Sequence, residues 1–143
     1  WLGTWAVRRL NLFARAALQM AVNQPERMTA AVRAGLLAAY DSWEHRVAVE
    51  RFVADIPASP RHPTWQVLAD IERGLLSLAN RPVQLIWGMR DWCFRPACLD
   101  RFLQLFPAAE THRLAEASHY VIEDAHEQFI PLVERFLDAH PLP

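Results

Sequence analysis

An aspartate and a histidine stand where acid–base chemistry could occur. Asp91 comes three residues after Gly88, which closes the apolar run 83–87, and His119 follows a second short run, 110–114. If both runs are parallel strands and neighbours, their carboxyl ends meet at one edge of the sheet, where ligands bind in open α/β sheets. An aspartate there can accept the Nδ1 proton of the imidazole and stabilise the imidazolium that forms when Nε2 takes up a proton.

Either residue alone has an ordinary interpretation. An aspartate after a glycine is commonly a turn residue, and a loop histidine is commonly a surface residue. The placement of both at strand ends favours a catalytic pair, which would be two-thirds of a nucleophile–His–acid triad. We therefore expect the Asp91 carboxylate and the His119 imidazole to lie within about 2.6–3.2 Å of each other.

The first 80 residues are predicted to be helical. Apolar residues recur at helical spacing over 2–21, Thr29 is a candidate cap for a helix through Leu37, and Thr64 is a candidate cap for another. Asp41 with Glu44 three residues later has the pattern of a capping box. This part of the sequence contains no clear strand.

The pattern changes at residue 82. The run 83–87 has the apolar character of a strand buried on both faces, and 110–114 is a second candidate strand. Helices are predicted from Pro96 to Phe106 and over 124–139, where Pro131 should kink the last helix. Two strands do not make an independent parallel sheet. We therefore expect the C-terminal part of an α/β protein, with a helical cap segment over 1–63 and core over 64–143.

Composition excludes several classes of partner. The net charge is -1, so the chain lacks the excess positive charge that is typical of nucleic-acid-binding proteins. The sequence also has no apolar run long enough to span a membrane. The cysteines Cys93 and Cys98 do not have the spacing of a zinc site or a disulfide framework. Reduced thiols, and with them a cytoplasmic location, are expected.

Two segments resemble a known family. Residues 82–91, PVQLIWGMRD, resemble the penultimate strand and acid-bearing turn of α/β-hydrolases, and residues 117–124, ASHYVIED, resemble their histidine loop. Ser118 and His126 stand where glycine and proline are common in that family, and neither difference touches the chemistry. The resemblance implies an α/β-hydrolase fold, with His119 and Asp91 as catalytic residues.

Further segments resemble one branch of this family. Residues 88–94, with 40–43 and 52–57, are similar to the haloalkane dehalogenase-like branch, most of all to the olefin-biosynthesis β-lactone decarboxylases beside it. That resemblance implies a small apolar or alkyl-bearing substrate, no metal or organic cofactor, and an aspartate nucleophile. The sequence has no G-x-D-x-G or G-x-S-x-G turn to carry a nucleophile. We therefore expect the nucleophile in a missing N-terminal half.

Aromatic residues flank the expected pair. Phe94 and Tyr120 are candidates for contact with an apolar substrate, and ordinary packing is an equal alternative for both. Two readings of function stay open at this point. One is a hydrolase or lyase of the family above, and the other is a non-catalytic helical binding or oligomerisation module with a vestigial His–Asp pair.

Overall fold

The structure is a computed structural model and describes residues 2–141 of the chain. Its elements are α1 (Leu2–Leu10), α2 (Leu12–Met20), η1 (Pro25–Arg27), α3 (Ala30–Ala38), α4 (Val47–Asp55), α5 (Pro63–Gly74), η2 (Leu75–Leu78), β1 (Gln84–Gly88), α6 (Pro96–Leu105), β2 (Glu110–Leu114) and α7 (Val121–Ala139). They form two compact units. One holds the chain up to residue 20 together with 28–74, and the other holds 21–27 together with the chain from residue 75 onward.

The two predicted strands pair as expected. β1 and β2 are parallel, in a register that runs from Gln84 opposite Glu110 to Gly88 opposite Leu114. β2 has the predicted bounds, whereas β1 begins one residue later than expected and includes Gly88. The α6 crossover between two parallel strands is the unit from which α/β folds are built.

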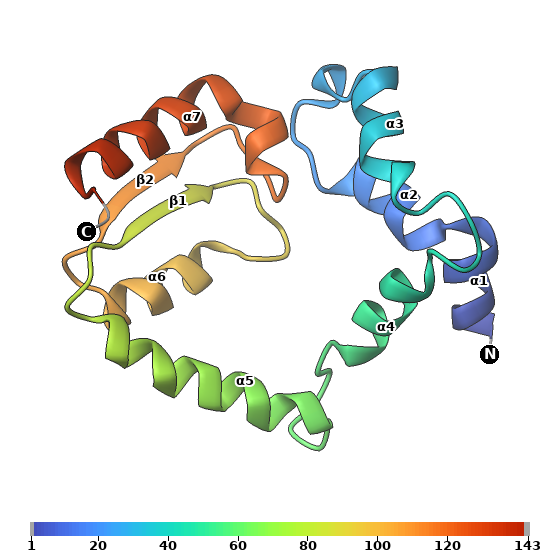
Figure 1. Ribbon diagram of the computed structural model, residues 1–143, viewed down its shortest axis with the longest axis horizontal. Coiled ribbons are helices and arrows are strands. Elements are labelled where there is room, and N and C mark those ends of the chain that lie inside the picture. The colour runs from blue at the N-terminus through green and yellow to red at the C-terminus, as the bar shows by residue number, and fades with distance from the viewer. Residues whose placement is uncertain (1, 142–143) are drawn as a thin grey trace. The chain divides into compact units, whose positions relative to one another are not determined.

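Helices lie on both faces of these strands, as Figure 1 shows for α6 and α7. Ile86 packs against a buried cluster formed by Leu114, Ala117 and Ala125, on the side of α7. The next residue, Trp87, points the other way and packs on Phe102 of α6, with 6.0 Å between ring centroids. Successive strand residues thus serve opposite faces, as the pleat requires.

The first strand has the composition of a strand buried on both faces, but this chain buries it only in part. Residues 84–87 are only half-buried, and Gly88 alone is fully buried within β1. The sheet of the described chain has two strands, with α7 packed on one face and α6 on the other.

Two helices break at places the sequence pattern did not indicate. The helical run expected over 2–21 is divided at Asn11, whose φ of 52° is left-handed, a conformation that asparagine tolerates better than most residues. The sequence predicts a kink of the last helix at Pro131. Its non-helical residue is instead Ala125, with φ −149° and ψ 35°.

The predicted helix starts were confirmed at some positions and wrong at others. Thr29 does cap α3, accepting a hydrogen bond from the Val32 backbone N–H. The capping box of Asp41 and Glu44 is wrong, because 43–46 form turns, α4 begins at Val47, and Asp41 binds His45 instead. Thr64 is not a cap either, since α5 already begins at Pro63.

Two arginines connect separate parts of the helical unit. The Arg46 guanidinium donates to the backbone oxygens of Tyr40, Asp41 and Arg8, and so ties the turn before α4 to α1. The Arg8 guanidinium lies 4.3 Å from the ring centroid of Trp43. Among residues 2–141, no helix has the length and apolar character needed to cross a membrane.

Candidate active site

The end of β1 runs directly beside the loop that carries His119. After Gly88, the backbone N–H of Met89 donates to Leu114 O at 3.0 Å, and that of Arg90 donates to Ala117 O at 2.9 Å. The turn that carries Asp91 is therefore hydrogen-bonded to the end of β2 and to the loop that follows it. This arrangement follows from the parallel pairing, which places both strand ends at one edge.

Gly88 makes this close approach possible. A Cβ atom on residue 88 would lie 2.7 Å from Ala117 O and would also overlap Ser118 O, both of them backbone atoms. Real Cβ atoms do not come so close to backbone oxygen, so only glycine fits here without a shift of the chain. The strand end and the histidine loop thus depend on residue 88 having no side chain.

Asp91 is fixed by its own turn. Its side chain is 7% exposed, and Oδ1 accepts backbone hydrogen bonds from Cys93 at 2.7 Å and Phe94 at 2.8 Å. This local pattern, an aspartate that bonds the backbone two and three residues later, is a common device of turns. It orients the carboxylate and leaves Oδ2 free for another donor.

That donor is His119. Its Nδ1 lies 2.9 Å from Asp91 Oδ2, within the range expected from the sequence. The His119 side chain is 29% exposed, so the ring is reached by solvent while its partner is buried. With Nδ1 engaged, Nε2 is the nitrogen that can exchange a proton, which is the arrangement of a general base held by a carboxylate.

The two flanking aromatic residues lie beside His119. Their ring centroids are 5.2 Å from the imidazole for Phe94 and 6.0 Å for Tyr120. Phe94 is 53% exposed, and its backbone oxygen accepts a 2.7 Å hydrogen bond from Trp87 Nε1. A side chain exposed beside a partly exposed imidazole is available to a ligand, and contact with substrate stays a prediction for both residues.

Sequence reasoning missed how the histidine loop is anchored. Asp124 is 1% exposed, and its oxygens accept hydrogen bonds from the backbone of Ser118, Asn23 and Gln24. Asp124 belongs to the quoted histidine-loop motif, but its partners Asn23 and Gln24 are 101 and 100 positions away. No local pattern pointed to them.

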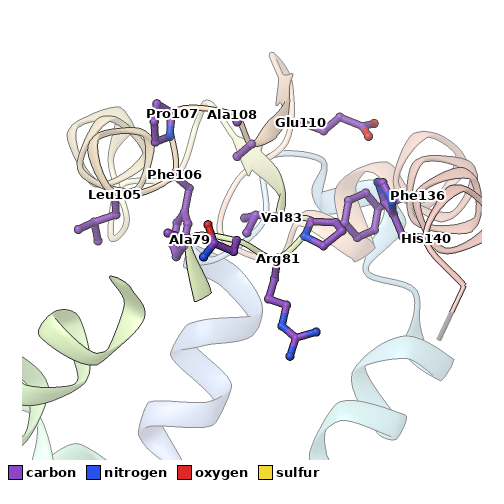
Figure 2. Close-up of a pocket in the computed structure, with 13 residues that line it drawn as sticks. Ala79, Arg81, Val83, Leu105, Phe106, Pro107, Ala108, Glu110, Phe136 and His140 are labelled. Atoms are coloured by element: carbon purple, nitrogen blue, oxygen red, sulfur yellow. The ribbon is translucent and has the colours of Figure 1, made fainter. Parts of the chain in front are cut away.

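A hollow of about 480 Å³ lies at the other end of the strands. Its lining includes Val83 and Glu110, at the amino ends of β1 and β2, and Phe106, which follows α6. Figure 2 shows Arg81 and His140 around it. A hydrogen bond from His112 lowers the pKa of the Glu110 carboxyl. Asp91 and His119 do not line this hollow.

Over the described residues, no cluster of three or more His, Cys, Asp or Glu side chains could hold a metal ion.

Comparison with known proteins finds two kinds of relative, decarboxylases and a haloalkane dehalogenase. The chain is 40% identical over 141 residues to a cis-3-alkyl-4-alkyloxetan-2-one decarboxylase of Xanthomonas campestris, and 32% identical over 136 residues to one of Shewanella oneidensis. The matches cover 99% and 95% of this chain. The chain is also 32% identical over 104 residues, 71% of its length, to haloalkane dehalogenase 2 of Mycobacterium bovis.

The chain spans less than half the length of these relatives. The matches cover 46% and 42% of the two decarboxylases and 36% of the dehalogenase. No protein-family model matches the chain.

Proposed function

Because this chain belongs to the α/β-hydrolase family, we propose that His119 and Asp91 are two members of a nucleophile–His–Asp triad. The observation that carries the proposal is the 2.9 Å contact between His119 Nδ1 and Asp91 Oδ2 at the ends of two parallel strands. In the proposal, the nucleophile comes from an N-terminal part that this chain does not include. The chain's span of 46% of its decarboxylase relative agrees with that. A cytoplasmic location, where Cys93 and Cys98 stay reduced, belongs to the same proposal.

The favoured substrate is a four-membered β-lactone with alkyl chains on adjacent ring carbons. The support is the match to the two decarboxylases, which extends over nearly the whole chain. Decarboxylation of such a ring breaks the bond between the ring oxygen and C4 and the bond between C2 and C3. The products are carbon dioxide and an alkene, so neither water nor an oxidant is consumed.

A haloalkane is the second candidate substrate, favoured by the match to the dehalogenase over 71% of this chain. An aspartate nucleophile would displace halide and form an alkyl ester. His119 would then remove a proton from water through Nε2, and the resulting hydroxide would attack the ester carbonyl, releasing the alcohol and restoring the aspartate. Asp91 would hold the imidazole and stabilise its positive charge.

The test uses the complete protein, with the sequence that precedes this chain included. We expect wild type to convert a cis-3,4-dialkyl oxetan-2-one to alkene and carbon dioxide, measured in the headspace by gas chromatography. If it instead releases halide from 1-bromohexane, the hydrolytic alternative is correct. In that case His119→Gln should accumulate a covalent alkyl adduct, seen by intact-mass spectrometry, because the water step is blocked.

His126→Gln is the matched control, since His126 is 52% exposed on α7 and is not bonded to Asp91. It should turn over like wild type. Full turnover by His119→Gln on the active substrate would overturn the catalytic assignment. If the wild-type protein turns over neither substrate, and His119→Gln binds both substrates as wild type does, the non-catalytic binding module is favoured.

A further inference from the structure

Asp124 is a buried charge with an unusual set of partners. It is 1% exposed, and among the described residues no arginine or histidine pairs with it. Every partner of its carboxylate is a backbone N–H: Ser118 at 2.7 Å, Gln24 at 2.9 Å, and Asn23 at 3.0 and 2.9 Å to the two oxygens. Burying a carboxylate without a cation is costly unless it is well hydrogen-bonded. The three donors offset that cost and tie their own segments to one point.

One of those segments is the histidine loop. Ser118 directly precedes His119, and its N–H donates to Asp124 while its hydroxyl donates to Arg90 O at 3.3 Å, next to Asp91. On the other side of His119, the Tyr120 N–H donates to Ala21 O at 2.7 Å. The backbone of His119 is therefore held on both sides. The imidazole itself is held by its contact with Asp91.

The second segment that Asp124 binds, residues 21–24, is itself held in place by further contacts. Ala21 is 2% exposed, and the Asn23 amide donates to Glu116 O at 2.9 Å, in the same loop. The Gln24 amide donates to Asp124 O at 3.0 Å. This segment belongs to the same compact unit as the strands, so its position relative to the loop is defined.

We propose that Asp124 is a positioning residue for His119. It acts by binding the Ser118 N–H and residues 23–24 at once, which holds the imidazole at hydrogen-bonding distance from Asp91. This inference rests on the proposed function, because positioning matters for turnover only if His119 is catalytic. Misplacing a reacting group by about 1 Å can cost about 100-fold in rate.

Asp124→Asn tests the proposal in the complete protein with the active substrate. An amide has one acceptor oxygen and would turn an NH2 group toward a backbone donor, so the anchor loosens. We expect kcat to fall by between about tenfold and 100-fold, with KM changed by less than about twofold. The downfield Nδ1–H proton resonance of His119 should weaken or broaden in parallel. Glu123→Gln, at the neighbouring position, should leave both readouts unchanged.

A double-mutant cycle separates positioning from a general structural role. If Asp124 acts through the His119–Asp91 contact, Asp124→Asn should have much less effect in an Asp91→Asn background than in wild type. Effects that simply multiply, or a kcat equal to that of wild type in folded Asp124→Asn, would overturn the inference. If Asp124→Asn does not fold, Asp124→Glu replaces it, because it keeps the charge but moves the carboxylate away from the Ser118 and Gln24 N–H groups. It should lower kcat by about fivefold through the weakening of one hydrogen bond, and an unchanged kcat would overturn the inference.

His119→Gln, assayed in parallel, distinguishes the two proposals. If that variant retains full turnover, the proposed function fails. If it is inactive while Asp124→Asn is fully active, the function stands and the positioning role fails.

Discussion

At the scale of single residues, the two oxygens of Asp91 have different tasks. Oδ1 accepts the Cys93 and Phe94 N–H groups and belongs to the turn, and Oδ2 accepts from His119. The first task fixes the direction of the second. A turn aspartate and a partner for imidazole are therefore the same residue here, and the two interpretations that the sequence offered do not compete.

This division predicts the effect of Asp91→Asn in the complete protein. The new amide oxygen can still accept the Cys93 and Phe94 N–H groups, so its NH2 group would face His119 Nδ1. The imidazole would then favour the wrong tautomer, a change that costs about 10⁴-fold in kcat in the analogous serine triad. We expect a loss of kcat of similar order with little change in the melting temperature. Asp100→Asn, on the exposed face of α6, is the control, and an Asp91→Asn kcat within threefold of wild type would contradict the assignment.

At the scale of elements, the site depends on how closely the end of β1 approaches the loop after β2. The Met89 and Arg90 N–H groups bond Leu114 O and Ala117 O, and Gly88 has backbone oxygens where a Cβ would be. The approach leaves no space for a side chain. The strand end and the histidine loop must therefore move together.

Gly88→Ala should accordingly damage both stability and activity. The added methyl overlaps backbone oxygens of Ala117 and Ser118, and relieving that overlap separates the two segments that carry Asp91 and His119. In the complete protein we expect a loss of about 1–3 kcal/mol in the free energy of unfolding, the usual cost of overpacking, measured by denaturant titration. Gly35→Ala, on α3 with nothing within 4 Å of the new Cβ, should instead stabilise slightly. Equal effects of the two substitutions would refute the argument.

The elements also show what the sequence could and could not predict. β-branched and apolar residues with Gly88 at the end were enough to place β1, and Pro96 at a first helical turn was enough to place α6. Their order then brought Asp91 and His119 to one edge. The break at Asn11 and the Asp124 anchor were not predictable in this way. Asn11 donates to Tyr40 O, and Asp124 binds residues 23–24, so each depends on a segment distant in sequence.

At the scale of the whole molecule, the chain leaves much apolar surface uncovered. Phe52 is 62% exposed on α4, and Leu137 is 58% exposed on α7. Residues 84–87 of β1 are only half-buried in a sheet that has two strands over the described residues. Exposed apolar faces and an unpaired strand edge are the usual causes of association.

We therefore expect these 143 residues, expressed alone, to associate or to be poorly soluble. Sedimentation velocity should show species larger than a 16.4 kDa monomer, and thermal unfolding should lack a single cooperative transition. Co-expression with the N-terminal part proposed above should reduce the association, because that part would cover the free edge of β1 and the exposed helix faces. The substitution Phe52→Gln serves as the control for helix exposure alone, and should help only partly if the strand edge also contributes. A monodisperse monomer that melts cooperatively would instead identify the chain as a self-sufficient domain, and would remove this argument for a missing structural partner.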